Sequence, residues 1–502
     1  MRGRVRRLCS NVTAAYFTCV VTSICSFVAV PVYLHFLGKE EYGLWLAILS
    51  VLMPLSLMGL GFPTVSQNML AETKPSERFD AMNRILNTSF TFLSLAAAAA
   101  CLVALALLKL GIIQRLLRTS PVLERTIVPV LLIALAGFAF NQPLQVFRLA
   151  LRAFERVDFE QYGVAVLSVV NLLLMALVLW SGHGIIGVAT VFALVQFAGG
   201  IIFFAVLTWE CPQMRLAPRY FSWGLLQEMA SPGFGFFVLS VSSVLIWGVD
   251  NLVISGVMGV AFLVSFATAE RLISTLQGMV AIPFNTSAPT ITALRAEGNE
   301  NGLKRLFAFS TKLALSASIL FAVELSCFGR SFIALWAGQS VLPDRSTFLV
   351  LTAILCVSVL QQPAYNLIVA TTRHRAYSRF VICEAIANLM LSWWWAHEWG
   401  VLGVALGTLI PHVLISGGYM IIVGTRMNGV TFSEAWGRHI VALALPTAIA
   451  AATGFLLRNF AASWMQWTVS SGLTFLVFVS ACWMASVTQE ERGALAAAFR
   501  LA

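Results

Sequence analysis

Long apolar stretches separated by short polar turns recur along the whole chain. Two examples are "YFTCVVTSICSFVAVPVYL" from Tyr16 and "FLSLAAAAACLVALALL" from Phe92. Each is close to the ~20 residues that a helix needs to cross the ~30 Å hydrocarbon core of a bilayer. Lipid offers the backbone no hydrogen-bond partner, so the spans are expected to be helices rather than open strands. The pattern predicts an all-α polytopic membrane protein with no separate soluble domain.

Fourteen stretches fit this description. They cover residues 12–36, 42–66, 87–110, 127–151, 162–181, 185–208, 231–257, 259–288, 307–329, 346–369, 380–397, 401–424, 439–457 and 465–486.

Composition agrees with this pattern. Hydrophobic residues make up 59% of the 502 residues and charged residues 11%, whereas about a quarter of a soluble domain is charged. Most of the net charge of +10 comes from Lys and Arg in alternate turns, which the positive-inside rule assigns to the cytoplasm. We therefore expect a multi-pass protein of the cytoplasmic (inner) membrane with both termini inside and no nucleic-acid partner. Arg115, Arg118 and Arg125 fall on the outer side and fit this topology least.

The N-terminal segment and the cysteines add two further expectations. "MRGRVRRLCS" precedes an apolar run without a small-x-small cleavage site, so it is interpreted as the start of a retained first helix. The nine Cys form no CxxC pair and the six His have no ligand spacing. We expect no disulfide, no metal site and no cofactor.

The chain contains an internal repeat. "GIIGVA" at Gly184 returns as "GVLGVA" at Gly400. Other landmarks return in the same order, and they align Gln142, Pro143 and Asn171 with Gln362, Pro363 and Asn388. The spacing between matching residues shortens steadily along the chain, which favours a duplicated unit, although chance likeness between apolar helices is the alternative.

The repeat predicts how the chain is organised. We expect two pseudo-symmetric six-helix lobes, 1–210 and 231–424. An amphipathic linker at 211–230 with Ser222 as a helix N-cap joins them, and a two-helix hairpin with a cytoplasmic tail follows at 425–502.

One stretch carries a family resemblance. "PVYLHFLGKEEYGLWLAILSVLMPLSLMGLGFPTVSQNMLAE" from Pro31 has a proline-bearing first helix, an "LGxxxYG" turn and a "GLG" near the end of the second helix. It resembles the O-antigen and polysaccharide repeat-unit flippases of the multidrug/oligosaccharidyl-lipid/polysaccharide exporter superfamily. "RAFERVDFEQYGVAVLSVVNLLL" and "WGVDNLVISGVMGVAFLVSFATAERL" are similar to later helices of that family. Two departures are Phe266, where the family often has Tyr, and Glu270, where it is often uncharged.

The resemblance implies a function. It suggests two six-helix lobes around a central cavity and a flippase that moves a polyprenyl-diphosphate-linked oligosaccharide from the inner to the outer leaflet by alternating access. Such a protein serves O-antigen or exopolysaccharide biosynthesis and is not an enzyme. Its partners would be that lipid-linked sugar, membrane lipid and other polysaccharide-assembly proteins, and we expect a monomer.

Charges deep in predicted spans are candidates for a binding site, because an ionisable group at the bilayer centre costs about 2.5–3.5 kcal/mol. Asp250 and Arg271 lie ~14 and ~18 Å from the turn at Gly259, at ~1.5 Å per residue, and could pair. Arg271 could bind the diphosphate while Asp250 orients it, or the pair could only fix the hairpin. Glu270 projects ~100° away from Arg271.

Other candidates lie nearer the ends of spans. Arg148 and Arg152 could receive the headgroup at the cytoplasmic mouth, although topology alone also accounts for them. For the sugar, candidate partners are Asn11, Thr18, Thr22, Ser243 and Trp247, all of which helix packing also explains. Asp250, Glu270 and Glu384 are candidates for ion coupling. The residues close enough to predicted ends to snorkel are Lys109, Arg148, Arg152, Lys312, Glu324 and Glu384.

Two other function classes compete with a flippase. A membrane glycosyltransferase, ligase or polymerase would need a large aqueous loop with acid, base or metal groups, and neither such a loop nor an HExxH or Walker motif is present. A cation-coupled multidrug exporter of the same superfamily would prefer an acidic cavity, and Arg271 suits an anionic ligand better.

Overall fold

The computed structural model describes residues 2–73, 78–154, 156–370, 374–427, 431 and 433–487, and every regular element in these ranges is a helix. Ten helices are long and apolar enough to cross a membrane, and an eleventh is added if the bent pair Trp223–Ser231 and Phe236–Trp247 counts as one span. The predicted all-α membrane fold is confirmed. The cytoplasmic tail predicted after residue 487 lies outside the described residues.

The chain forms two compact units. Unit 1 comprises residues 1–267 and 388–404, and unit 2 comprises 268–387 and 405–502. The predicted lobe boundaries, 1–210 and 231–424, stay predictions.

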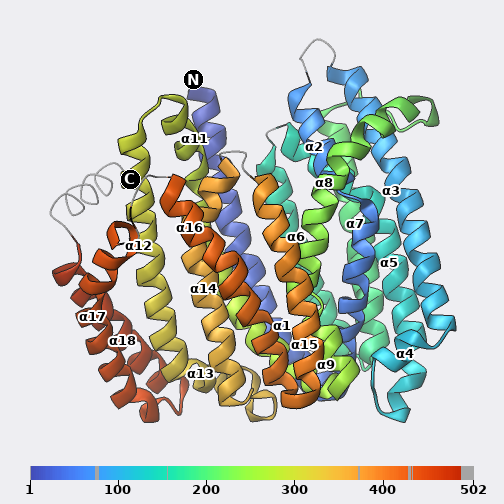
Figure 1. The fold of residues 1–502 in the computed structure, drawn as a ribbon. Coiled ribbons are helices and arrows are strands. Elements are labelled where there is room, and N and C mark those ends of the chain that lie inside the picture. Colours follow the sequence, from blue (N-terminus) through green and yellow to red (C-terminus); the bar gives the residue numbers. More distant parts are fainter. Residues whose placement is uncertain are drawn as a thin grey trace. The chain divides into compact units, whose positions relative to one another are not determined.

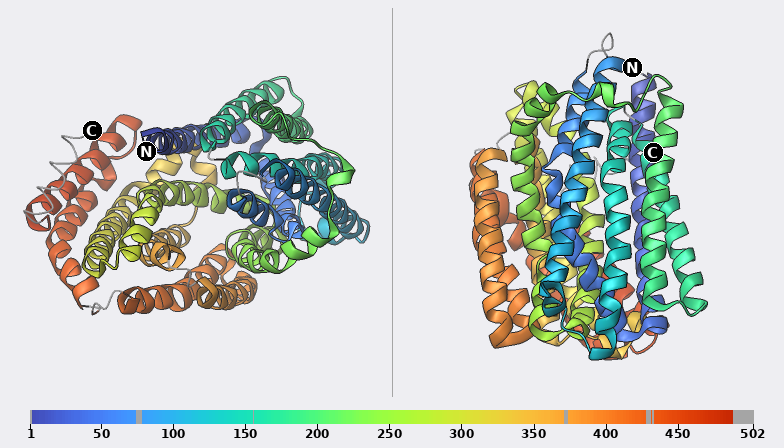
Figure 2. Two further views of the ribbon diagram at one scale, coloured as in Figure 1. Left: turned by 90° about the horizontal axis from the view of Figure 1, so that it is seen from above. Right: turned by 90° about the vertical axis from the view of Figure 1, so that its right-hand side faces the viewer.

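Unit 1 holds most helices of the first half. These are α1 (Arg2–Leu55), α2 (Phe62–Glu72), α3 (Arg78–Lys109), α4 (Ile112–Leu116), α5 (Pro121–Ala153), α6 (Val157–Trp180), α7 (Gly184–Glu210), α8 (Trp223–Trp247) and α9 (Asp250–Met258). Helices α3, α5, α7 and α6 run side by side (Figures 1 and 2). Phe62, Met82, Leu86 and Phe147 belong to the buried core between them.

Unit 2 holds most helices of the second half. These are α11 (Ala288–Ala296), α12 (Glu300–Glu324), α13 (Arg330–Ala337), α14 (Arg345–Ala370), a π-helical segment η5 (His412–Gly417), α16 (Gly418–Met427), α17 (Arg438–Leu457) and α18 (Trp464–Ala485). Two helices are divided between the units, α10 (Val260–Thr286) and α15 (His374–Pro411). Ile291, Phe307, Leu367 and Met420 belong to the unit 2 core.

Two long helical stretches, Thr13–Gly59 and Tyr377–Met427, each contain a pair of predicted spans. The turn between the two spans is a glycine in the left-handed region, Gly38 with φ 73° and Gly400 with φ 60°. Only glycine adopts such a φ without a steric cost. These breaks account in part for the difference between ten long helices and fourteen predicted spans. The other two predicted spans, the seventh and the eighth, fall in α8 to α10.

The internal repeat is visible in the backbone of unit 1. Gly184 and Gly400, the first residues of "GIIGVA" and "GVLGVA", both have positive φ, 56° and 60°. Three positions further on, a methyl group at Gly187 would overlap Val178, and one at Gly403 would overlap Trp395. Val178 and Trp395 are themselves matched in the register that aligns Asn171 with Asn388. The repeated glycines therefore permit a close contact at matched positions in both copies, with the Val178 side chain in the first and the Trp395 backbone in the second.

Polar side chains of α3 hold the linker after α7 against unit 1. Asn83 Oδ1 accepts a hydrogen bond from Arg215 N at 2.8 Å, and Asn87 both accepts from Ala217 N at 2.9 Å and donates to Arg215 O at 2.8 Å. The hydroxyl of Ser222 accepts from Leu225 N at 3.3 Å. The prediction that Ser222 is an N-cap is confirmed, but the helix that it caps is α8, which continues into the span with a bend of 56°.

The C-terminal hairpin of α17 and α18 packs on α12 (Figure 1). Lys312 Nζ donates to Ser486 O at 2.5 Å, and Ser471 donates to Glu324 Oε2 at 2.8 Å. The expectation that Lys312 and Glu324 can snorkel stays a prediction, and the structure shows that their polar ends bind the hairpin.

Candidate functional site

Two arginines at the end of α5 share one buried carboxylate. Arg152 Nη2 lies 2.9 Å and Arg148 Nε 3.6 Å from Oε1 of Glu160 on α6. The arginines are one turn apart and therefore project to the same side of α5. Glu160 is favourably placed in the first turn of α6, where the helix dipole stabilises a negative charge. Two positive charges facing one negative charge leave a net charge of +1 at this place.

The carboxylate and the arginines of this cluster differ in solvent exposure. The Glu160 side chain is 2% exposed, whereas those of Arg148 and Arg152 are 38% and 37% exposed. The carboxylate accepts a hydrogen bond from Arg152 and forms a longer ion pair with Arg148, and part of each guanidinium side chain stays exposed. Guanidinium presents paired donors that match phosphate oxygens, so this arrangement is suited to binding an anionic headgroup.

The cluster is connected to the first helix. Gln161 Nε2 donates to Glu160 Oε2 at 3.0 Å, and the backbone oxygen of Gln161 accepts from Thr18 Oγ1 at 2.9 Å. Thr22 donates to the carbonyls of Thr18 and Cys19 in its own helix. Of the polar stripe predicted on the first helix, Thr18 therefore packs the helix against α6, and the Asn11 side chain lies outside the described residues.

At a neighbouring arginine, negative side chains outnumber positive ones. Arg156 lies 2.8 Å from Glu210 and 3.8 Å from Asp158, and its guanidinium stacks 4.2 Å from the centre of the Phe159 ring. Two carboxylates thus face one guanidinium. Arg156 joins α6 to the end of α7 and adds no net positive charge to the cluster.

The predicted residues of the seventh and eighth spans are distributed over both units. In unit 1, Asp250 begins α9 and is buried, while Ser243 and Trp247 are exposed. In unit 2, Arg271 is exposed and Glu270 is half-buried. The ion pair predicted between Asp250 and Arg271 would join the two units and stays a prediction.

Glu384 is the centre of a buried polar network in unit 2. It lies on α15 and is 2% exposed, so the expectation that it snorkels is wrong. His412 Nδ1 lies 2.7 Å from Glu384 Oε1, and Ser416 donates to Oε2. On the other side of the imidazole, Ser358 Oγ of α14 lies 3.0 Å from His412 Nε2. Gln361 Nε2 lies 3.4 Å from both His412 Nε2 and His412 O.

The series Ser358, His412, Glu384 has the atom order of a hydrolase triad, but its surroundings do not suit acyl transfer. Ser358 is 5% and His412 6% exposed. Ser358 lies within α14, where backbone N–H groups are engaged in the helix and none is aimed at a developing oxyanion. The arrangement is suited to holding a proton rather than to cleaving an ester.

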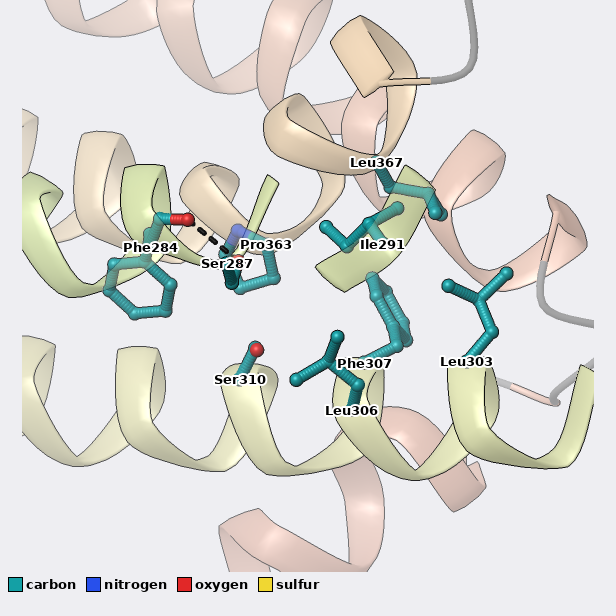
Figure 3. A pocket seen from close by; sticks show the side chains of 9 residues that line it. All are labelled: Phe284, Ser287, Ile291, Leu303, Leu306, Phe307, Ser310, Pro363 and Leu367. Carbon is teal, nitrogen blue, oxygen red and sulfur yellow. Dashed lines mark hydrogen bonds between the residues drawn. The ribbon is translucent and has the colours of Figure 1, made fainter. Parts of the chain in front are cut away.

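Two hollows in the structure differ in chemistry from these clusters. Figure 3 shows a small pocket in unit 2, in which the Ser287 hydroxyl donates to Phe284 O at 2.7 Å. Its other lining residues are Ile291, Leu303, Leu306, Phe307, Ser310, Pro363 and Leu367, none of them charged. A groove in unit 1 is lined by Glu72, Asp80, Arg84 and Glu228 among others. Apolar walls in the first and excess carboxylates in the second make neither suitable for a diphosphate.

Sequence reasoning identifies Arg148, Arg152 and Glu384 but misses their partners. Glu160 is not identified because it lies in the first turn after a loop. His412 is not identified because it is considered only as a metal ligand. The described residues contain no group of three or more His, Cys, Asp or Glu that could hold a metal ion. The repeat itself carries a useful signal, since Glu384 stands in the second copy where the first copy has Leu167.

Comparison with known proteins identifies the family and the fold of the chain. A family described as polysaccharide biosynthesis protein matches residues 8–295. Among curated proteins none matches the sequence. A solved structure of the lipid II flippase MurJ in an inward closed conformation has a TM-score of 0.72 at 15% identity, covering 94% of this chain and 98% of that one.

Two further solved structures have the same fold. An inward-facing multidrug resistance MATE family transporter of the MOP superfamily has a TM-score of 0.67 at 14% identity, covering 82% of this chain and 98% of that one. A MOP superfamily transporter from Pyrococcus furiosus has a TM-score of 0.56 at 14% identity, covering 85% and 95%. At these identities the likeness shows the fold alone. With the family match over more than half of the sequence, the chain belongs to the polysaccharide biosynthesis protein family and has the fold of the MOP superfamily transporters.

Proposed function

We propose that this protein is a flippase that moves a polyprenyl-diphosphate-linked oligosaccharide from the inner to the outer leaflet of the cytoplasmic membrane. The observation that carries the proposal is the pair Arg148 and Arg152, held by the single carboxylate of Glu160 with a net charge of +1. A diphosphate is the part of such a lipid that can be recognised whatever sugar it carries. The family match and the likeness to a lipid II flippase support the same interpretation.

The arginine pair acts as the first contact in this proposal. Positive charge at the end of α5 is assigned to the cytoplasmic face, which also places both termini inside. The headgroup binds the exposed parts of Arg148 and Arg152, and Arg271, Asp250 and Glu270 are the candidates for later contacts. Ser243 and Trp247 are exposed polar and aromatic groups that can contact the sugar. Two six-helix lobes, 1–210 and 231–424, alternate the access.

The cellular setting follows from the same chemistry. The substrate is a repeat unit of an O-antigen or exopolysaccharide, and other polysaccharide-assembly proteins consume it after translocation. The protein works as a monomer without a cofactor. It performs no bond cleavage, since translocation needs only binding and release.

The test replaces the two arginines in cells that carry no other copy of the gene. Arg148→Gln with Arg152→Gln removes two charge-assisted contacts, each of ~1.5–3 kcal/mol, so export should fall by more than about tenfold. Complete lipid-linked repeats should accumulate on the inner leaflet. Arg148→Lys with Arg152→Lys should restore export in part, because lysine keeps the charge but loses the paired donors.

Two controls keep the outcome interpretable. Arg125→Gln changes an exposed arginine at the other end of α5 and should leave export unchanged. Adding Glu160→Gln to the double variant makes the cluster neutral and removes an unpaired buried carboxylate, so this triple variant should insert normally and still fail to export. Normal surface polysaccharide in the triple variant would contradict the proposal. Unchanged lipid-linked repeats in a deletion strain that becomes sensitive to drugs would instead favour the multidrug exporter.

A further inference from the structure

The buried network in unit 2 contains two titratable groups in direct contact. Glu384 and His412 come from segments 28 residues apart in the chain, and their Oε1 and Nδ1 atoms are 2.7 Å apart. All of Glu384, His412, Ser416, Ser358 and Gln361 are less than one-tenth exposed. An ionisable pair in the middle of a transporter helix bundle is costly to bury, which makes it a candidate for a functional role.

The geometry of the contacts suits an ionised carboxylate. Oε2 accepts from Ser416, and Oε1 lies 2.7 Å from His412 Nδ1, which donates to it in the tautomer that carries its hydrogen on Nδ1. In that tautomer Nε2 is the acceptor of the neutral ring. Ser358 Oγ, 3.0 Å away, donates to it.

The same network also accommodates a protonated imidazole. When Nε2 gains a proton it becomes a donor, and the Ser358 hydroxyl can rotate to accept. The Gln361 side chain also lies at 3.4 Å and can turn its amide to present oxygen. The Cβ-free Gly417 lies next to Gln361, since a methyl group there would come within 3.5 Å of Gln361 Nε2. Both partners of Nε2 can therefore donate or accept.

The aromatic residues next to the pair are phenols. Tyr377 on α15 interacts with Glu384 and Ser416, and Tyr365 on α14 and Tyr419 on α16 pack against the Tyr377 ring. The charged side chains that the structure describes on the helices packed here lie elsewhere. Arg379 on α15, Arg295 on α11 and Arg305 on α12 are exposed, Arg345 and Arg426 lie at the ends of α14 and α16, and Lys312 and Glu324 bind the C-terminal hairpin.

We propose that Glu384 and His412 form a proton-binding site in unit 2, which takes up one proton on His412 Nε2 and releases it once in each transport cycle. Uptake changes the charge of the pair from −1 to 0, because the buried carboxylate then faces a positive partner instead of a neutral one. This change biases the conformation of α15 and η5, and an inward proton gradient then drives export. The transport cycle in this proposal rests on the proposed function, whereas the proton binding does not.

Proton binding is tested on the full-length protein in lipid nanodiscs. Nitrogen-15 solid-state NMR of labelled histidine follows the ring, and His412→Gln identifies the signal by its loss. The His412 signal should change from protonated to neutral as the pH rises within about pH 5 to 8, and Glu384→Gln should shift that transition to lower pH by removing the neighbouring negative charge. A ring that keeps one protonation state throughout this range, or a transition unaffected by Glu384→Gln, would overturn the site.

Coupling is tested in proteoliposomes that contain a polyprenyl-diphosphate oligosaccharide. In the wild type one coupled proton should raise the outer-to-inner ratio of the lipid-linked sugar by up to about tenfold per pH unit of gradient, and the export rate should rise with the gradient. His412→Gln should make the rate independent of the gradient. His397→Gln, which changes an exposed histidine of the same helix as Glu384, should behave as the wild type. Ser416→Ala removes a hydrogen bond without a titratable group, and it should lower stability while keeping the dependence on pH.

The outcomes separate the two proposals. Gradient dependence that persists in His412→Gln, or export driven by sodium at constant pH, would overturn proton coupling at this pair. If the wild type moved no lipid-linked sugar under any gradient, the proposed function would fail while the NMR transition of His412 would still stand.

Discussion

The same pair of helices is built twice in this chain, and its interior differs between the copies. In the first copy Leu167 of α6 packs against Gly199 of α7, where a methyl group would come within 2.9 Å of Leu167 Cδ1. In the register that aligns Asn171 with Asn388 and Gly184 with Gly400, the residues that correspond to Glu384, His412 and Ser416 are Leu167, Gln196 and Gly200. One copy thus holds an apolar contact where the other holds an ionisable network. The backbone differs at this place as well, since residues 412–417 form the π-helical segment η5, whereas residues 196–201 belong to the α-helix α7.

The two copies also differ at the ends of these helices, where the first copy has a carboxylate and the second copy has none at the matching position. Glu160, which binds Arg148 and Arg152, corresponds to Tyr377 in the second copy. Glu160 is the fourth residue of α6, whereas Glu384 is the eleventh of α15. Seven positions correspond to ~10 Å along a helix. The first copy therefore has its carboxylate near the helix end and the second has it deep in the span.

The largest effect is expected from giving the first copy the carboxylate of the second. Leu167→Glu places a carboxylate in an apolar contact, which should lower the free energy of unfolding by about 3 kcal/mol. Thermal unfolding in detergent measures this change. Adding Gln196→His should recover part of it if the two copies are equivalent in geometry. An unchanged unfolding temperature in Leu167→Glu would show that the contact at Leu167 reaches water.

A smaller effect is expected at the helix ends. Glu160→Gln weakens a charged hydrogen bond from Arg152 and leaves two neighbouring guanidinium groups unbalanced, so we expect a loss of about 2 kcal/mol. Tyr377→Phe, at the corresponding position of the second copy, should cost less, because it removes no charge. Equal losses from the two variants, measured by unfolding in the same detergent, would mean that the ends of the two copies do not differ in this way.

The smallest effect concerns the starts of α14 and α5. Asp344 Oδ2 accepts from Thr347 N at 2.9 Å and from Ser346 Oγ at 2.6 Å and so caps α14, whereas Ser120 donates to Glu40 and makes no cap hydrogen bond for α5. Asp344→Ala should cost about 1 kcal/mol, and Ser120→Ala should cost less. Comparable losses would contradict the assignment of the cap.

The cap at Asp344 also predicts a dependence on pH. Partial burial acts to raise the pKa of Asp344, but the hydrogen bonds from Ser346 and Thr347 outweigh it and hold the pKa below its ordinary value. A carboxyl whose pKa is lowered by folding stabilises the folded state above its ordinary pKa, and this contribution is lost as the pH falls through the lowered value. The difference in stability between the wild type and Asp344→Asn should therefore shrink in acid.

Much of the fold could be predicted from the sequence because apolar length and glycine turns are local signals. Gly38 and Gly400 mark breaks that the structure places in the same positions. The partners in the candidate sites could not be predicted in the same way. Glu160 and His412 join Arg152 and Glu384 across helix boundaries, and hydrophobic periodicity says nothing about which polar faces meet. The proposed contact of Asp250 with Arg271 depends on the two units and stays a prediction.

The division of the chain into units has a consequence for its synthesis. Residues 388–404 belong to unit 1, and Asn388 Nδ2 donates to Ile246 O at 3.4 Å within that unit. The ribosome reaches this segment only after it has made the whole of 268–387, which belongs to unit 2. Helices α1 to α9 are therefore synthesised before the last segment of unit 1 is available to pack against them. A stalled or truncated chain that ends before residue 388 would expose an unfinished surface to the quality-control proteases of the membrane.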